Sequence, residues 1–390
     1  MDKLIYLVYP VLLICLFAGS KVCLKRGEWN EDFLSLKQTK MIQGFLALVI
    51  LCHHLSQKLS AYWMDERFYR PGMEFFVDLG YLCVSVFFFY SGFGLLKSYM
   101  NKENYLKGYF KRRVLLVVIA FYTSEIFYLI ARLARGEKMN LKKFLIYLIG
   151  IKQTSSYAWY AIIIILFYIL FYIVCKLLKT PGKVTAAMWI LTLVYIICGT
   201  YINHNDYFFR GEWWYNSVIL FPIGMSFAMC EEKICKVFKK IYPLLLPLCF
   251  ILAVVMFFVA LKSTFDFSYY YNESPIKIIA KYPTVWRRWV CVSAQSLAAV
   301  MFTLVILIFS MKVKIGNKVL DFMGGITLEF YLIQGLFVCL FCFIFEDDLP
   351  SLYFIENPTL YCIVVLVLSL IGALICKKIN QVIMGIFKEK

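Results

Sequence analysis

The chain has 390 residues, of which 62% are hydrophobic and 17% are charged, and its mean hydropathy is +0.75. Soluble domains contain about 45–50% apolar and about 25% charged residues, so this composition excludes an ordinary soluble domain. Disordered and nucleic-acid-binding proteins are excluded as well, because the apolar residues fall in long blocks separated by short basic loops. The net charge of +17 fits the surplus Lys and Arg of cytoplasmic loops.

A membrane-spanning helix needs about 20 mainly apolar residues, and this rule predicts eleven spans. Their ranges are 4–20, 41–58, 75–96, 114–132, 157–175, 184–202, 214–230, 242–261, 289–311, 326–345 and 358–376. The stretch 141–151 is too short to span and is predicted to lie at the membrane interface. We therefore predict an all-α, polytopic membrane bundle of about 11 transmembrane helices.

The distribution of Lys and Arg predicts the orientation of these spans. With the N-terminus outside, most of the Lys and Arg residues lie on the inner side. The loops 97–113 and 312–325 and the C-terminus are then cytoplasmic, and the loops 58–74, 203–213 and 262–288 are extracytoplasmic. The first span also has the basic start, apolar middle and small-residue end of a signal peptide, which is the alternative interpretation of this segment.

Most of the 14 cysteines lie inside apolar runs, where Cys behaves as a small hydrophobic residue. Cys339 and Cys342 form one Cys-x-x-Cys pair, in the segment LFVCLFCFIF, with no His near it. We interpret this pair as core packing, and we predict no disulfide scaffold and no bound metal.

Aromatic and polar side chains are concentrated in the loops predicted to lie outside. Such a mixture suits a polyhydroxylated ligand, which it would hold by ring contacts and hydrogen bonds. The alternative is an ordinary aromatic belt at the membrane interface. The candidates for substrate binding in these loops are Trp63, Asp65, His204, Asp206 and Trp214.

Two of the three histidines are adjacent within the second span, TKMIQGFLALVILCHHLSQ. Ionisable groups inside spans are costly and are candidates for function. An imidazole can take a proton from a hydroxyl near neutral pH and return it later, so His53 and His54 are the candidates for a general base. Gln43 and His54 point within about 20° of each other, whereas His53 points about 100° away. The alternative is that both histidines bond carbonyl groups at the outer interface.

Several segments of the chain have a family resemblance. They are the span with the two histidines, FFVDLGYLCVSVFFFYSGFGLL, YLKGYFKRRV, SSYAWYAIIIILFYILFY, WWYNSVILFPIGMSFA and GNKVLDFMGGITLEFYLIQGLF. In this order they resemble the acyltransferase-3 family of membrane O-acyltransferases over residues 38–376. The resemblance implies a ten-helix acyltransferase core at 38–376, with an additional helix and loop at 1–37 and a short basic cytoplasmic tail at 377–390.

The family resemblance also suggests roles for residues of the second span. The family's first core helix usually carries an Arg, ten further residues and then an essential His. That pattern places His54 at the His position and Gln43 at the Arg position, so the His is kept and the Arg is not. Lys40 lies one turn earlier and could supply the positive charge, although Lys cannot reproduce a bidentate guanidinium. The family often has a second His where this chain has Gln334.

The basic run Lys111, Arg112 and Arg113 matches the family's basic run at the inner end of a span. The resemblance implies that such residues help to hold acyl-coenzyme A, whose phosphates suit charge-assisted contacts with Arg. The alternative is ordinary positive-inside anchoring. From the motif of the middle span, Trp159 joins the candidates for substrate binding.

Two acids inside spans, Glu125 and Glu329, need partners. Either could orient His54 by accepting its second ring N–H, as an Asp does in hydrolase triads. Buried acids together with Ser91 and Gln334 would also suit a solute or proton path, so a membrane transporter of a small solute or of an acyl or glycan intermediate is the alternative function.

We expect a multi-pass protein of the cell membrane, in a bacterial plasma membrane by resemblance. Its predicted reaction transfers an acyl group, with acetyl as the first candidate, from cytoplasmic acetyl-CoA or another acyl-CoA. The predicted acceptor is a hydroxyl of an extracytoplasmic polysaccharide or of a lipid-linked glycan. The predicted partners are the lipid bilayer and that glycan acceptor, with no nucleic acid.

Overall fold

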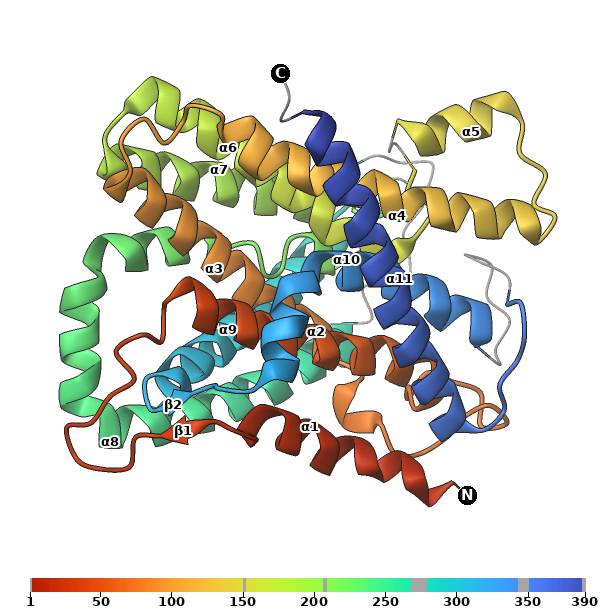
Figure 1. The fold of residues 1–390 in the computed structure, drawn as a ribbon, viewed down its shortest axis with the longest axis horizontal. Coiled ribbons are helices and arrows are strands. Elements are labelled where there is room, and N and C mark those ends of the chain that lie inside the picture. The colour runs from red at the N-terminus through yellow and green to blue at the C-terminus, as the bar shows by residue number, and fades with distance from the viewer. Residues whose placement is uncertain (1, 150–151, 206–208, 268–278, 343–350, 388–390) are drawn as a thin grey trace.

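The computed structural model describes residues 2–149, 152–205, 209–267, 279–342 and 351–387, and its regular structure is almost entirely helical (Figure 1). The helices are α1 (Val8–Phe17), α2 (Leu36–Leu59), α3 (Gly80–Asn101), α4 (Leu115–Ala134), α5 (Leu141–Leu148), α6 (Trp159–Leu178), α7 (Pro181–Tyr201), α8 (Leu220–Phe267), α9 (Thr284–Ser310), α10 (Lys318–Phe341) and α11 (Pro358–Ile386). Short 3₁₀ turns are η1 (Lys3–Leu7), η2 (Glu74–Phe76), η4 (Ser156–Ala158) and η5 (Glu212–Trp214), and η3 (Phe110–Val114) is a π-helical turn. The strands β1 (Lys21–Val22) and β2 (Val313–Lys314) pair antiparallel.

The predicted all-α membrane bundle is confirmed. Among the described residues, nine helices are long and apolar enough to cross a membrane. One of them, α8, contains two of the predicted spans, and Figure 1 shows that it turns back within its length. The first predicted span is the short apolar helix formed by η1 and α1 over Lys3–Phe17.

The turn of α8 has a cause in the sequence. The backbone leaves helical geometry at Cys230, and the charged stretch EEKICKVFKK that follows separates the two apolar parts of the helix. This stretch stays helical where a loop was expected between 230 and 242. Pro243 and Pro247 lie inside the helix and weaken its hydrogen-bonding ladder at the start of the second apolar part.

The centre of the bundle is formed by α2 and α3, whose apolar windows are 72% and 78% buried. Glycines allow close approach there. A Cβ added at Gly44 would lie 2.6 Å from the backbone nitrogen of Gly324, so α2 and α10 touch backbone to backbone. A Cβ at Gly92 would likewise collide with the carbonyl oxygen of Phe221, where α3 meets α8.

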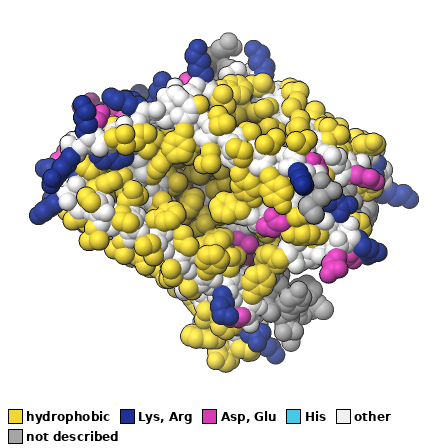
Figure 2. All heavy atoms as spheres, turned by 90° about the horizontal axis from the view of Figure 1, so that it is seen from below, with side chains coloured by type: hydrophobic (Ala, Val, Ile, Leu, Met, Phe, Trp, Pro, Cys, Tyr) yellow, Lys and Arg dark blue, Asp and Glu magenta, His cyan; other side chains and the backbone are white. Residues whose placement is uncertain are grey.

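The outer surface matches a membrane environment. Figure 2 shows an apolar band across the molecule, with Lys and Arg gathered at its left-hand end and acidic side chains toward its right. In Figure 1, the connection from α3 to α4 and the turn from α6 to α7 lie at that left-hand end, and α2 starts there and runs to the right. The helix α5 contacts α4 through Tyr147, whose ring centroid lies 5.6 Å from the guanidinium carbon of Arg132, whereas its apolar side chains Leu141 and Leu148 are 72% and 46% exposed.

Candidate functional site

His54 lies in the outer half of α2 and is buried, with 7% of its surface exposed. The ring of Tyr157 from η4 packs edge-on against it, with 4.4 Å between ring centroids. The Nδ1 atom of His54 is buried and has no hydrogen-bond partner among the described residues. Since buried polar atoms are nearly always paired, this nitrogen is available for a bound molecule.

His53 has a different environment, as its position on the helix predicts. Its Nδ1 lies 3.0 Å from the carbonyl oxygen of Phe76, and its ring packs on the backbone of Gly80. These contacts fix the start of α3 against α2. His53 is therefore suited to a structural role, and His54 remains the candidate for a general base.

The segment that carries Tyr157 is held by buried polar contacts. Glu125 of α4 accepts hydrogen bonds from the backbone nitrogen and the hydroxyl of Thr154, at 3.0 and 2.5 Å. Arg132, two turns further along α4, donates two hydrogen bonds to the carbonyl oxygen of Thr154, at 3.2 and 2.7 Å. Ser155 accepts from the backbone nitrogen of Tyr157 at 3.1 Å. Glu125 thus positions the segment and makes no hydrogen bond to His54 among the described residues.

Unpaired polar atoms collect around this segment. Both amide atoms of Gln153 and one oxygen of Glu125 are buried without a partner among the described residues. The same holds for both amide atoms of Gln334 on α10, which is fully buried. The next residue, Gly335, packs against the ring of Tyr157, and a Cβ there would lie 2.7 Å from the hydroxyl of Tyr128. The elements α2, α4, η4 and α10 therefore meet at this point.

Glu329 lies five residues before Gln334 on α10, and its carboxylate accepts a hydrogen bond. Asn380 of α11 donates to it at 3.1 Å, and Thr123 of α4 donates to Asn380 at 2.7 Å. These bonds tie three helices together. They supply the partners that an acid inside a span needs, so the predicted role of Glu329 as an orienter of His54 has no contact to support it.

Gln43 and Lys40 lie in the first half of α2, far from His54 along the helix axis. Gln43 is half-buried, and Lys40 is exposed at the start of the helix. By the rise of a helix, Lys40 lies roughly 21 Å from His54 along the axis. Whether Gln43 and Lys40 contact a donor stays a prediction.

The basic run lies in the π-helical turn η3, a form that is often found at functional sites. Arg112 donates to the carbonyl oxygen of Tyr105 at 2.8 Å, and Arg113 donates to its hydroxyl at 3.3 Å. Lys111 donates to the carbonyl oxygen of Phe387. Tyr105 thus holds both arginines near one place.

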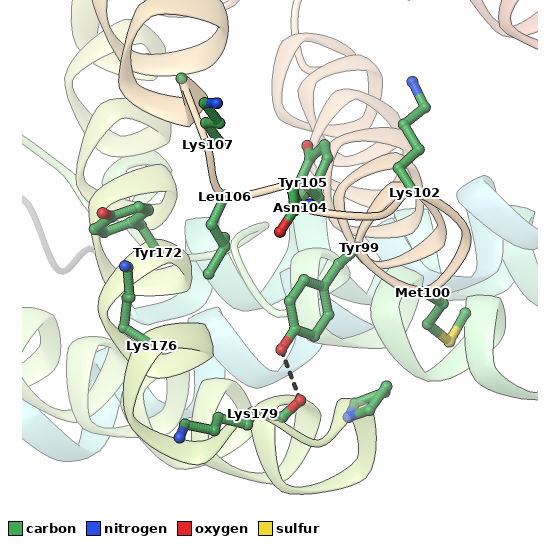
Figure 3. Close-up of a pocket in the computed structure, with 12 residues that line it drawn as sticks. Tyr99, Met100, Lys102, Asn104, Tyr105, Leu106, Lys107, Tyr172, Lys176 and Lys179 are labelled. Atoms are coloured by element: carbon green, nitrogen blue, oxygen red, sulfur yellow. Dashed lines mark hydrogen bonds between the residues drawn. The ribbon is translucent and has the colours of Figure 1, made fainter.

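A cavity of about 830 Å³ opens beside these arginines (Figure 3). Its charged side chains are all lysines, namely Lys102, Lys107, Lys176 and Lys179. Tyr99, Tyr105 and Tyr172 provide aromatic rings, and the Tyr99 hydroxyl donates to the carbonyl oxygen of Lys179 at 2.6 Å. The cavity has the size of a small-molecule site and attracts anions.

A series of polar side chains leads from the basic run into the bundle. Arg113 lies beside Tyr168 of α6, whose hydroxyl hydrogen-bonds to Ser91 of α3 at 3.5 Å. Tyr160 also interacts with Ser91, and its ring packs on Tyr331 of α10 with 5.6 Å between centroids. We call Arg113, Tyr168, Ser91, Tyr160 and Tyr331 the polar track. It ends one turn before Gln334 on α10.

The predicted substrate-binding residues differ in their exposure. Trp63 is 55% exposed and packs edge-on against Tyr62. Asp65 is also exposed, and hydrogen bonds from the side chain and backbone of Arg67 lower the pKa of Asp65 to about 2. Asp206 lies outside the described residues.

The other three candidates are buried. Trp159 lies in the core at the start of α6. His204 lies 2.9 Å through its Nε2 from the hydroxyl of Tyr215. The indole nitrogen of Trp214 is buried without a partner among the described residues. Their contact with a substrate stays a prediction.

The acid Asp78 is half-buried and lies just before α3. Burial raises the pKa of Asp78 to about 6, against the lowering effect of a hydrogen bond with Tyr62. Tyr62 follows α2, so this bond joins the outer ends of α2 and α3.

Several residues of these sites were not predicted from the sequence, among them Tyr157, Gln153 and Arg132. A Tyr or Gln next to a span is common and gives no signal. Arg132 has a signal, since it lies seven residues after Glu125 and hence on the same face of a helix. Two of the four lysines of the cavity follow α3 and the other two lie in the last turn of α6 and just after it, and no pattern in the sequence brings them together.

Residues 40–378 match the sequence model of an acyltransferase domain, that of the acyltransferase-3 family. Comparisons with curated proteins and with solved structures gave no match. Among the described residues, no group of three or more His, Cys, Asp or Glu side chains could hold a metal ion. Because the match covers most of the chain, including His54, the basic run and Gln334, the protein belongs to the acyltransferase-3 family and is a multi-pass membrane acyltransferase.

Proposed function

We propose that the protein transfers an acyl group from acyl-CoA at the cytoplasmic face to a hydroxyl of an extracytoplasmic or lipid-linked glycan. Acetyl is the first candidate for the acyl group. The observation that carries this proposal is the buried His54 with its unpaired Nδ1, at the junction of four elements in an acyltransferase domain. The unpaired nitrogen supports a role in proton transfer, because a purely structural histidine would bond a neighbour, as His53 does.

His54 acts as the general base in this reaction. It takes the proton of the acceptor hydroxyl while the hydroxyl oxygen attacks the carbonyl carbon of the thioester. The tetrahedral intermediate then collapses, the carbon–sulfur bond breaks, and the leaving thiolate takes the proton from His54. The base is thereby restored and atoms and charge balance.

The donor is held at the inner face. The lysine cavity and the arginines beside it suit the phosphates of coenzyme A, and the tyrosine rings suit its adenine. The pantetheine arm follows the polar track, whose hydroxyl groups can hydrogen-bond with its two amides. The rise of α2 from Lys40 to His54, roughly 21 Å, sets the depth that the arm must reach.

The acceptor approaches from the opposite side. His54 lies five residues before the end of α2, which is roughly 8 Å along the helix axis. A hydroxyl of a glycan at the outer surface therefore reaches His54 without crossing the membrane. Among the described residues, Glu125 bonds the segment at Thr154 and Glu329 bonds Asn380, so both acids have a role in holding elements together, which weakens the alternative of a transporter.

The test is transfer of labelled acetyl from acetyl-CoA in membranes that contain the protein, at matched expression. We expect His54→Ala to lose at least about 100-fold of the rate, the usual contribution of a general base. The control is His53→Asn, which keeps a donor near the Phe76 carbonyl and should lower stability more than the rate. Full activity of His54→Ala, or no transfer by the wild type, would contradict the proposal.

A further inference from the structure

Gln334 of α10 has no part in the reaction described above. Its side chain is fully buried in α10, yet neither the amide oxygen nor the amide nitrogen has a hydrogen-bond partner among the described residues. Leaving a buried polar group unpaired is costly, and native proteins seldom do so without a reason. A bound molecule that pairs with this amide would remove the cost.

The position of Gln334 relates it to His54. The helices α2 and α10 contact each other at Gly44 and Gly324, and Lys40 also touches Gly324. Because both helices run in the same direction from there, a residue ten positions beyond Gly44 and one ten positions beyond Gly324 lie at the same height, roughly 15 Å further along. These residues are His54 and Gln334.

Two contacts narrow the position further. Gly335 packs on the ring of Tyr157, which itself packs on His54. Tyr331, one turn before Gln334 and on the same face of α10, forms the end of the polar track through its contact with Tyr160. Gln334 therefore lies where the track from the inner face reaches the site of His54.

We propose that Gln334 is a catalytic residue that donates a hydrogen bond from its amide nitrogen to the carbonyl oxygen of the thioester. The proposal rests on the proposed function. When the acceptor oxygen bonds to the thioester carbon, the carbonyl oxygen becomes negatively charged, and it returns to a carbonyl when the carbon–sulfur bond breaks. A donor fixed in a water-free interior stabilises that charge strongly, because it needs no reorganisation during the reaction. The full burial of Gln334 and its unpaired amide meet this requirement.

The experiment compares Gln334→Leu, Gln334→His and Ser369→Ala with the wild type and with His54→Ala. Kinetics of acetyl transfer from labelled acetyl-CoA and thermal unfolding in detergent are measured for each. We expect Gln334→Leu to lower kcat about 100- to 1,000-fold with little change in KM, the usual effect of removing one such donor. Its melting temperature should stay equal or rise, because an unpaired buried amide is removed.

The remaining variants separate the role from a structural one. Gln334→His restores a ring N–H and should recover at least tenfold of the kcat lost in Gln334→Leu. Ser369 is also fully buried and unpaired among the described residues, but on α11, so Ser369→Ala should leave kcat unchanged.

Two outcomes would overturn the proposal separately from the function. One is a kcat of Gln334→Leu within threefold of wild type while His54→Ala is inactive. The other is a loss of activity that follows a lowered melting temperature and that Gln334→His does not relieve. Absence of transfer in the wild type would instead contradict the proposed function itself, and the role of Gln334 with it.

Discussion

At the scale of single residues, the contacts of the adjacent His53 and His54 indicate which role each histidine suits. Both lie on α2. His53 contacts the carbonyl oxygen of Phe76 and packs on Gly80, whereas His54 packs on Tyr157 and its Nδ1 has no partner among the described residues. Glu125 acts in the same way on a neighbour, because its contacts determine where Thr154 and hence Tyr157 lie.

Glu125→Ala should destabilise the protein and lower acyl transfer together. The substitution leaves the buried donors of Thr154 without their acceptor, which costs about 1–3 kcal/mol. It also releases the segment that presses Tyr157 against His54. Thermal unfolding in detergent and the transfer assay measure both effects. Glu231→Ala is the control, because its partly exposed ion pair with Lys97 is worth under about 1 kcal/mol. Unchanged stability of Glu125→Ala would refute the positioning role.

Asp78 should make stability depend on pH. The pKa of Asp78 is raised to about 6 in the folded protein by burial, so the unfolded chain releases the proton at lower pH than the folded one. Its contribution, about 1–3 kcal/mol, is present below about pH 4 and is lost as the pH rises through about 6. Asp78→Asn should show a flatter dependence of the melting temperature between pH 4 and 7. Parallel curves for the two proteins would speak against this assignment.

At the scale of helices, contacts between backbones determine how the elements pack. The two glycines of α3 illustrate the difference, because Gly92 lies against the carbonyl group of Phe221 whereas Gly94 has no atom within 4 Å of an added Cβ. Only the first is needed for packing against α8.

Gly92→Ala should therefore cost about 1–3 kcal/mol of stability, since α3 or α8 must shift to make room. Gly94→Ala, two residues away in the same helix, should be neutral or gain up to about 1 kcal/mol from helix propensity. Unfolding of both variants in detergent provides the comparison. Equal effects of the two substitutions would mean that the contact between α3 and α8 is not tight.

At the scale of the whole molecule, the proposed function requires two ends that differ. The lysine cavity lies at one end of the bundle, and His54 lies toward the other, with the polar track between them. This arrangement suits the proposed meeting of a donor and an acceptor from opposite sides of a membrane.

The lysine cavity should determine affinity for the donor. Lys107→Glu combined with Lys179→Glu should raise KM for acetyl-CoA roughly tenfold or more, because each reversal replaces attraction by repulsion of about 1 kcal/mol or more. The maximal rate should change little, since His54 is distant. Lys142→Glu, on the exposed helix α5, serves as the matched control. An unchanged KM of the double variant would place the donor elsewhere.

The orientation should be visible in fusion proteins. A fluorescent protein fused to the C-terminus should fluoresce, as it does when cytoplasmic. Alkaline phosphatase fused after residue 66, in the loop that follows α2, should be active, as it is only outside. The reverse pattern would invert the topology and place the lysine cavity at the outer face.

The all-helical membrane class and the order of the spans could be predicted from the sequence, because both depend on local composition, which a single chain displays directly. The motifs also indicated the family, and through the family's Arg–His spacing they favour His54 over His53 as the base, which stays a prediction. The continuous helix of α8 across the charged stretch was not predicted, because a charged segment between two spans has the same composition whether it is a loop or a surface helix.

Which side chains meet became known only from the packing of the helices. Tyr157, Gln334 and His54 are separated by more than a hundred residues each and come together because glycines let α2 and α10 touch. The lysines of the cavity and the partners of Glu125 and Glu329 likewise come from different elements. Helix period determines which face a residue lies on, but the partner of that face depends on packing between distant segments, which no local pattern encodes.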